Sequence, residues 1–308
     1  MEQKNMKILI TGAKGFVGSA TRKLFEERGM EVVSFDIMEK LDIRNYRQLL
    51  GFVTAEQPDR ILHLAAIARF SEADADPLLA HETNVLGTKN VAQVAKDYNI
   101  PLVYASTGSV YMPIYQDPPI TEDFKVCGNS VYGCTKAIGE LYIKSAGVPW
   151  IILRYAHLYG KEKRNHGLIG GFLQRIERGL VPTLYGGKQS NDFTYINDVA
   201  EANYCAITAS WDSWNQAYNI GTGEELTAKQ AGDLVCKAAG YEGKVEEKEQ
   251  RGVDPLRFVY DCSKAEKMLG FKAAYTFEKG LEDMFKKEGD QHDTPEPSSG
   301  SSHEVLVS

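Results

Sequence analysis

The sequence predicts an α/β protein, in which a doubly wound parallel sheet is followed by a smaller mixed α/β lobe. Three observations predict this fold: short apolar runs alternate with amphipathic stretches from residue 7 to about 105, a glycine-rich turn joins the first two elements, and the composition changes after about residue 160. A chain of 308 residues that is 43% hydrophobic is long enough for one large unit or two smaller lobes.

Alternating periodicities place the elements in order along the chain. Apolar runs predict strands at 7–11, 31–36, 60–65, 101–106 and 150–155, and amphipathic stretches predict helices at 16–28, 45–56, 78–97 and 131–145. We expect the first unit to span residues 1–160, with a return segment near 196–221. Residues 161–195 and 222–288 would form the smaller lobe, and the polar, Pro/Ser/Gly-rich residues 289–308 a disordered tail.

Charge and cysteine content exclude several kinds of partner. The net charge of -7 and the pI near 5.5 argue against a nucleic acid or an anionic membrane as the main partner. Five cysteines without Cys-x-x-Cys spacing predict neither a disulfide framework nor a metal site. Because we find no apolar signal region at the N-terminus and no apolar run of membrane-spanning length, we expect a cytoplasmic protein.

The turn after the first strand predicts dinucleotide binding. Gly12 and Gly15 allow a tight turn in which a pyrophosphate approaches the N–H groups of the helix that begins with Phe16 and Val17. Gly18 lets that helix pack closely on the strand. A plain turn is the alternative, but the strand before and the helix after this loop favour the dinucleotide.

Acidic residues after the second strand indicate which dinucleotide is bound. Asp36 lies 18 residues past Gly18, where a carboxylate can accept both ribose hydroxyls and would repel a 2′-phosphate, so it favours NAD over NADP. Lys14 is a signal in the other direction, although its side chain can simply be solvated. Asp42 and Ile43 could hold the adenine edge, or Asp42 could cap the next helix.

The third strand ends in residues that suit a backbone close to a cofactor. The run at its end consists of His63, Leu64, Ala65 and Ala66. Small side chains let a ligand approach the backbone, whereas His63 itself is expected to be a buried histidine of the sheet.

Tyr132 and Lys136 lie one helical turn apart, in a pattern that can make a phenol into a base. Oxidation of a secondary alcohol by hydride transfer needs a base, yet a free tyrosine with a pKa near 10 is mostly protonated at neutral pH. The ammonium group of Lys136 and a positive nicotinamide ring would both stabilise the phenolate and lower its pKa. A surface pair is the alternative, which the preceding glycine loop disfavours.

Several motifs follow one another in an order that resembles the extended short-chain dehydrogenase/reductase superfamily: TGAKGFVG, LHLAA, NVLGTKNV, YASTGSVY, YGCTK, LRYAHLYG, DFTYINDVA, YNIGTGEE and DCSKAEKMLGF. The resemblance covers about residues 7–285 and is strongest to the NAD-dependent nucleotide-sugar epimerase/dehydratase family, which includes UDP-hexose 4-epimerases. It implies a Rossmann-type NAD-binding domain at 1–160, a nucleotide-diphosphate sugar as substrate for the second lobe, and a homodimer formed through helices 78–97 and 131–145.

The same resemblance implies roles for residues near the catalytic pair. Thr107 would hydrogen-bond the reacting sugar oxygen, with Ser106 as the neighbouring candidate, and either could instead be a strand-end cap. Asn84 would brace the cofactor side of the site or cap helix backbone. Tyr132 and Lys136 would act in catalysis and also contact the cofactor.

Gly108 and Ser109 stand where dehydratases of the family carry an Asp-Glu pair, so dehydration is not expected. Ser109 also replaces the cysteine of GDP-mannose 3,5-epimerases. Reversible oxidation remains, either in a UDP-hexose 4-epimerase or in a nucleotide-linked 4-keto-sugar reductase. A non-catalytic dinucleotide sensor is a third possibility.

The substrate side departs from the family pattern. His157 stands where the epimerases usually have Asn, and Asn191 replaces an Arg that normally meets the substrate diphosphate. Arg251 matches a second phosphate-binding Arg, and Tyr185 resembles the residue that lines the nucleotide base. His157 could contact the ligand or merely fill the cleft, and Tyr185 could belong to the core.

Overall fold

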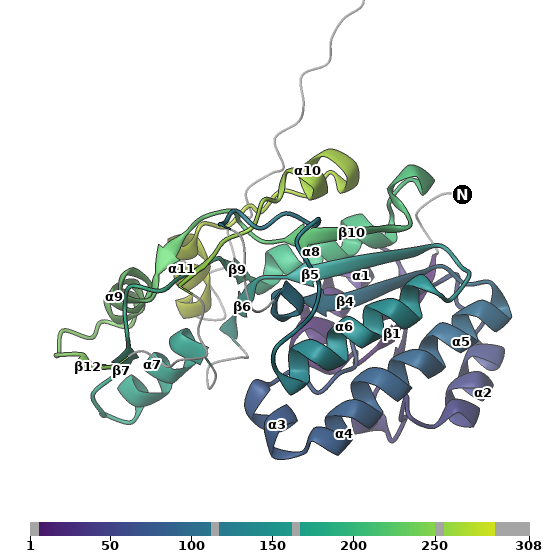
Figure 1. Cartoon of the computed structure of the whole chain (residues 1–308), viewed down its shortest axis with the longest axis horizontal. Coiled ribbons are helices and arrows are strands. Elements are labelled where there is room, and N and C mark those ends of the chain that lie inside the picture. The colour runs from purple at the N-terminus through teal and green to yellow at the C-terminus, as the bar shows by residue number, and fades with distance from the viewer. Residues whose placement is uncertain (1–5, 112–116, 162–166, 250–255, 287–308) are drawn as a thin grey trace, which may run out of the picture.

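Six parallel strands form the centre of the computed structural model, which describes residues 6–111, 117–161, 167–249 and 256–286 (Figure 1). The order across the sheet is β10-β5-β4-β3-β1-β2. Its strands are β1 (Lys7–Thr11), β2 (Glu31–Phe35), β3 (Arg60–His63), β4 (Leu102–Thr107), β5 (Trp150–Tyr155) and β10 (Gln216–Ile220). β1 pairs with both β2 and β3, so the order reverses there, and doubly wound sheets bind ligands at the carboxyl ends beside such a reversal. The predicted sheet is confirmed.

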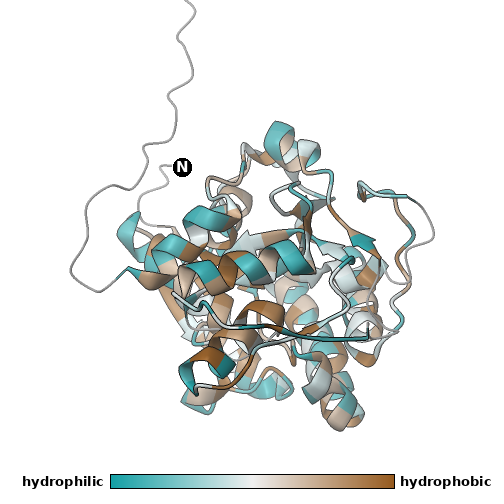
Figure 2. Ribbon diagram, turned by 90° about the vertical axis from the view of Figure 1, so that its left-hand side faces the viewer, coloured by the Kyte–Doolittle hydropathy of each residue, from teal (hydrophilic) through white to brown (hydrophobic). Residues whose placement is uncertain are grey.

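Helices cover both faces of this sheet. On one face α1 (Phe16–Glu27) packs against α8 (Ile196–Ile207), and on the other lie α2 (Tyr46–Glu56), α5 (Thr88–Tyr98) and α6 (Val131–Lys144). Ile8 and Ile10 point into one hydrophobic core and Leu9 into the other, because successive side chains of a strand face opposite sides. Figure 2 shows hydrophilic and hydrophobic positions mixed along the helices that face the viewer, as expected where one side of a helix is buried.

The helix predicted over 78–97 is present as a helical stretch over 77–98, whose middle segment is π-helical instead of α-helical. The chain forms α3 (Phe70–Ala75), α4 (Pro77–His81), a π-helical segment η2 (Glu82–Gly87) and then α5. Asp76 caps α4 by accepting the N–H of Leu79 at 2.9 Å, and Pro77 occupies the first turn. The wider π turn carries Gly87 next to Ile43, where a Cβ would lie 2.6 Å from the Ile43 side chain.

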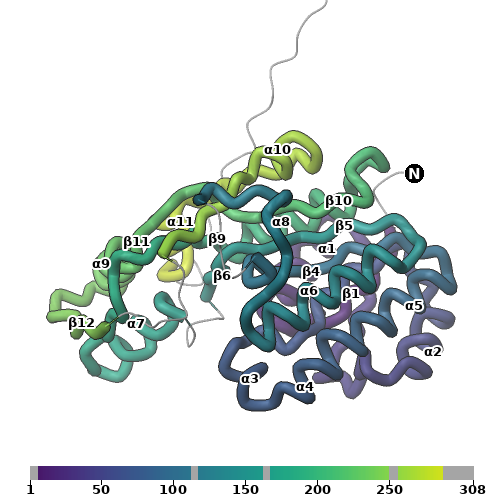
Figure 3. The backbone as a smooth tube through the Cα atoms, viewed as in Figure 1, coloured from purple at the N-terminus to yellow at the C-terminus, as the bar shows by residue number. Residues whose placement is uncertain are grey.

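The remaining strands are short and mostly lie beyond the main sheet. β6 (His157–Tyr159) pairs with β9 (Phe193–Tyr195), and β8 (Ser190–Asn191) lies between β11 (Leu226–Thr227) and β13 (Arg257–Phe258). β7 (Thr183–Tyr185) pairs with β12 (Glu246–Lys248), near α7 (Gly167–Glu177) and α9 (Ala228–Ala238). Figure 3 places α7, α9 and β12 at the end of the molecule away from α2 and α5.

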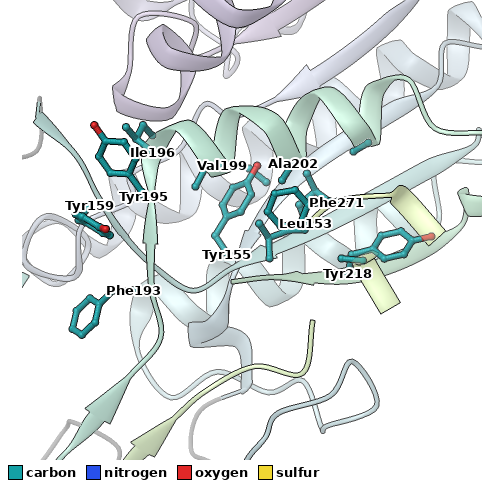
Figure 4. Close-up of a cluster of buried hydrophobic side chains, with 14 of the residues drawn as sticks. Leu153, Tyr155, Tyr159, Phe193, Tyr195, Ile196, Val199, Ala202, Tyr218 and Phe271 are labelled. Carbon is teal, nitrogen blue, oxygen red and sulfur yellow. The ribbon is translucent and has the colours of Figure 1, made fainter. Parts of the chain in front are cut away.

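A continuous hydrophobic core joins the sheet to these outer elements. Figure 4 shows Leu153 and Tyr155 beneath α8, with Tyr195 and Phe193 extending the cluster toward the smaller sheets. The last helices are α10 (Ser263–Leu269), which packs against β10 and α8, and α11 (Phe277–Phe285), which packs against α9. The predicted tail, 289–308, lies outside the described residues. Among the described helices, none combines the length and the apolar character needed to cross a bilayer.

Candidate active site

The glycine loop between β1 and α1 fits a dinucleotide phosphate. Gly12 has a φ of +72°, and a Cβ there would lie 2.8 Å from the backbone N and Cα of Ala65. A Cβ on Gly18 would lie 2.1 Å from the carbonyl oxygen of Gly12. Phe16 and Val17 form the first turn of α1, whose N-terminus has no side-chain cap. Backbone N–H groups in such a turn are the donors that hold phosphate oxygens.

Asp36 follows β2 directly, and its side chain is buried. Its carboxylate accepts the backbone N–H of Lys14 at 2.9 Å and that of Met38 at 2.8 Å, so it joins the glycine loop to the end of β2. The Lys14 ammonium forms an ion pair with Glu39 at 3.0 Å. The ammonium group of Lys14 could attract the 2′-phosphate of NADP, but Glu39 neutralises it. Together with the carboxylate of Asp36, this arrangement favours NAD over NADP.

Asp42 and Ile43 lie in the turn before α2. The Asp42 carboxylate accepts the N–H of Arg44 at 2.9 Å and forms an ion pair with its guanidinium at 2.6 Å. The cap of α2 is Asn45, whose side chain accepts the N–H of Gln48 at 3.1 Å, so the alternative in which Asp42 caps this helix is wrong. Ile43 is buried in the core. An adenine contact by either residue stays a prediction.

Asn84 holds the loop that leaves β3. Its amide oxygen accepts the N–H of Ile67 at 2.8 Å, and its amide nitrogen donates to the Ile67 carbonyl and to Thr135 Oγ1, both at 3.0 Å. Asn84 thus ties residues 64–67, which pass beside the glycine loop, to α6. These bonds brace the loop, and the role of Asn84 toward the cofactor stays a prediction.

His63 is a buried histidine of the sheet, as the sequence analysis expects. Its ring nitrogens contact Thr11 Oγ1 at 2.7 Å and Thr88 Oγ1 at 3.0 Å. Burial, together with the nearby charge of Lys136, lowers the pKa of His63 to about 3. The ring is therefore neutral at physiological pH.

β4 and α6 bring Thr107, Tyr132 and Lys136 together. Ser130 caps α6 through its hydroxyl, which puts Tyr132 in the first turn and Lys136 one turn further along. Thr107 ends β4 near the hydroxyl of Tyr132, whose pKa it lowers, and its own hydroxyl donates to Ser109 Oγ at 3.3 Å. Lys136 is only 3% exposed, and its Nζ lies 4.1 Å from the centre of the Tyr104 ring.

Burial dominates the electrostatics of this pair. It raises the pKa of Tyr132 to about 12, against the hydrogen bond from Thr107, which lowers it. Burial also lowers the pKa of Lys136 to about 7, while the negative charge of Glu140 acts in the opposite direction. In the protein alone the phenol is therefore a weaker acid than free tyrosine, and an added positive charge is needed to make it a base.

Ser106 lies apart from the triad. It is buried, and its hydroxyl donates to Glu140 Oε1 at 2.7 Å. Arg154 donates to the two Glu140 oxygens at 2.9 and 2.7 Å and also to Tyr111 Oη at 2.7 Å, which donates in turn to Asn219. Ser106 is thus one contact of a buried polar network under α6, and the structure does not bring its hydroxyl beside Tyr132.

His157 and Asn191 lie near the end of β4. His157, at the start of β6, is exposed, and its ring meets that of Phe258 edge-on at 5.2 Å. Phe258 also packs against Gly108, where a Cβ would lie 2.1 Å from its ring. Asn191 is paired with Phe258 in the β8–β13 register, so the two side chains share a face of that sheet.

The two remaining substrate candidates are Tyr185 and Arg251. Tyr185 ends β7, which belongs to the separate two-stranded sheet with β12. Arg251 lies outside the described residues. Within those residues, no group of three or more His, Cys, Asp or Glu side chains is arranged to hold a metal ion.

A doubly wound sheet whose glycine loop and Tyr-x-x-x-Lys helix meet at one edge defines the extended short-chain dehydrogenase/reductase class, to which this chain belongs. A sequence profile of the NAD dependent epimerase/dehydratase family matches residues 8–221. The chain is therefore a member of that family. This membership confirms NAD, the cofactor expected from Asp36. The glycine loop fits a dinucleotide, because a side chain at Gly12 or Gly18 would collide with neighbouring backbone atoms.

Known proteins resemble the chain over most of its length. A candidate UDP-glucose 4-epimerase of Methanocaldococcus jannaschii is 30% identical over 89% of this chain and 95% of its own. The structure of the UDP-glucose 4-epimerase of Thermotoga maritima with UDP-glucose has a TM-score of 0.83 and 26% identity, covering 90% of this chain and 96% of its own. The Thermus thermophilus UDP-glucose 4-epimerase in complex with NAD has a TM-score of 0.81 and 28% identity, covering 90% and 97%.

Proposed function

We propose that this protein is an NAD-dependent nucleotide-sugar 4-epimerase that acts on a UDP-hexose. The observation that carries the proposal is the meeting of Thr107, Tyr132 and Lys136 at the carboxyl edge of the sheet that also carries the glycine loop. UDP-glucose 4-epimerases among the relatives and solved structures support the choice of substrate class.

Each member of the triad has a distinct task in this reaction. Bound NAD would supply the hydride acceptor and donor for C4 of the sugar. Tyr132 takes the proton of the C4 hydroxyl, and Thr107 donates a hydrogen bond that holds the reacting oxygen beside the phenol. Lys136 would hydrogen-bond the nicotinamide ribose and, when protonated, place positive charge next to the phenol. Once the keto sugar has turned the other face of C4 to the hydride donor, Tyr132 returns the proton to the C4 oxygen, and the configuration at C4 is inverted.

The position after Thr107 favours epimerisation over dehydration. Elimination of water needs an acid and a base beside the sugar, and Gly108 supplies neither. Phe258 packs so closely on Gly108 that a Cβ would overlap its ring, so a carboxylate would not fit there without rearrangement. Ser109 is the other residue at this place, and its backbone N–H donates to Thr107 Oγ1 at 3.2 Å.

The proposed nucleotide-sugar site combines His157, Asn191, Tyr185 and Arg251. Asn191 provides an uncharged amide where an arginine would form a charged hydrogen bond to the substrate diphosphate. Loss of that charged contact would cost about 1.5–3 kcal/mol of substrate binding free energy. The neighbouring Arg257 does not replace that charge, because its guanidinium forms a two-fold ion pair with Glu225 at 2.7 and 2.6 Å. Arg251, by its sequence position, would carry the diphosphate contact.

A homodimer and a cytoplasmic location belong to the same proposal. α4, η2 and α6 pack together, and they expose apolar side chains. These side chains are Leu78, Leu86, Ile138 and Leu141. Four apolar residues on adjacent helices suit a helical interface with a second copy.

The test is turnover without added cofactor. The purified protein is given UDP-glucose or UDP-galactose, and we expect interconversion of the two by NAD that co-purifies. Tyr132→Phe should retain the cofactor and lose most of the activity. Turnover of a 4-keto sugar alone, with added reduced cofactor, would favour the reductase instead, and bound NAD without any turnover would favour the sensor.

A further inference from the structure

An exposed aromatic ring lies beside the catalytic tyrosine. Phe70 opens α3, and its ring centre is 5.5 Å from that of Tyr132, at an interplanar angle of 77°. This is the edge-to-face geometry that aromatic pairs prefer. Half of the Phe70 surface, 50%, nevertheless remains exposed. A large apolar side chain left this open next to a reactive group has surface available for a ligand.

The fold holds Phe70 in this place. The loop that leads from β3 to α3 is fixed through Ile67, whose N–H and carbonyl both bond to Asn84. Asn84 also bonds Thr135 of α6, so the loop and the catalytic helix are tied together three residues before Phe70. α3 itself packs against α6 and is anchored by Ala73, which is completely buried.

Tyr132 thus has neighbours of two kinds. The side chain of Thr107 lies near the hydroxyl of Tyr132, whereas Phe70 contacts the ring of Tyr132. A sugar whose hydroxyl approaches the phenol between them would bring its C–H groups toward the exposed surface of Phe70. Contacts between C–H groups and an aromatic ring are apolar and non-directional, unlike hydrogen bonds.

We infer that Phe70 forms an aromatic wall of the hexose subsite and retains the sugar while it presents first one face and then the other. The inference rests on the proposed 4-epimerase function, in which an uncharged keto sugar must turn without leaving. A hydrogen-bond donor in this place would hold one orientation of the sugar. The wall stabilises both orientations to a similar degree, because its attraction depends on area rather than direction.

Direct binding distinguishes a wall for the sugar from a packing partner of Tyr132. Calorimetric titration of the NAD-loaded protein with UDP-glucose and with UDP is compared for the wild type, Phe70→Ala and Phe70→Tyr. We expect Phe70→Ala to weaken UDP-glucose roughly 3- to 10-fold, the range for loss of an aromatic contact. Binding of UDP should not change, and Phe70→Tyr should restore the wild-type preference. Trp211→Ala, which removes a 61% exposed aromatic at the opposite end of the sheet, is the control and should change neither.

Turnover gives a second readout. During UDP-glucose conversion without added cofactor, Phe70→Ala should lose keto sugar and accumulate reduced cofactor, seen as absorbance at 340 nm, with a raised KM. Equal affinity of wild type and Phe70→Ala for UDP-glucose, or equal weakening of UDP and UDP-glucose, overturns the inference. A wild type that binds UDP-glucose without converting it refutes the proposed function, while the binding comparison still decides on Phe70. A wild type that binds neither ligand overturns both.

Discussion

The ion pair beneath the catalytic helix gives the sharpest prediction for stability. Glu140 and Arg154 are 0% and 2% exposed, and two hydrogen bonds of 2.7 and 2.9 Å join them. Burial raises the pKa of Glu140, but the hydrogen bonds from Arg154 and Ser106 outweigh it and hold that pKa below its usual value. Glu140→Gln would leave the guanidinium of Arg154 buried without a counter-charge. Removal of one partner from a buried pair costs about 3–5 kcal/mol, a large share of the ~5–15 kcal/mol that stabilises a typical domain.

The cost can be measured by urea unfolding, monitored by circular dichroism. If the dependence of the unfolding free energy on urea concentration is unchanged, the shift of the transition midpoint gives the loss of stability. Lys144→Gln is the matched control, since Lys144 contacts the same carboxylate at 3.3 Å but is 37% exposed, and its loss should cost less than about 1 kcal/mol. The double variant Glu140→Gln/Arg154→Met should recover much of the loss, because it also removes the buried charge. The reasoning is refuted if Glu140→Gln costs no more than Lys144→Gln.

Three further predictions concern the cofactor, the lysine and the dimer. Gly18→Ala should abolish NAD binding and lower the melting temperature, because the added Cβ would meet the Gly12 carbonyl oxygen. The control is Gly51→Ala in α2, where nothing lies within 4 Å of the added Cβ, and it should stabilise the helix by about 0.5–1 kcal/mol. Equal NAD affinity of the two variants would contradict the proposed role of Gly18. Burial lowers the pKa of Lys136 to about 7, so between pH 7 and 10 the unfolded chain binds a proton that the folded protein lacks. The free energy of unfolding should therefore rise by up to about 1.4 kcal/mol per pH unit in this range. Urea unfolding of Lys136→Met at several pH values should show no such rise. If the proposed homodimer forms, Leu141→Glu, at a side chain 65% exposed on α6, should make the protein monomeric in analytical ultracentrifugation. A wild type that is already monomeric would exclude the interface.

The parts of the fold that depend on local pattern could be predicted from the sequence. β1, β2, β4 and β5 fall where apolar runs predict them, since a buried parallel strand needs an unbroken run of such residues. The helix predicted over 78–97 is found within the helical stretch 77–98, but the sequence pattern does not indicate that its middle segment is π-helical. Gly87 in this segment packs against Ile43, a contact between residues that are distant in sequence.

The candidate site shows the same division. The glycine loop and the Tyr132–Lys136 spacing are local motifs and are visible in the sequence. Glu140 and Arg154 were missed, although two signals were present: a carboxylate four residues after Lys136 on the same helix, and a charged residue inside the apolar strand WIILRY. The position of Ser106 beside Thr107 in the sequence makes it a candidate contact of the sugar. Only the structure shows that its hydroxyl donates to Glu140, a residue distant in sequence.

Positive charge beside Tyr132 is proposed to turn a weakly acidic phenol into a base, and the ionisation of that phenol can be measured. Absorbance at 295 nm is followed through a pH titration, and the difference between wild type and Tyr132→Phe isolates one residue among 16 tyrosines. Without cofactor we expect a pKa of about 12 for Tyr132, because its side chain is buried. With NAD bound the pKa should fall well below 10, the value for free tyrosine. A pKa that stays at or above 10 in the NAD complex would contradict the account.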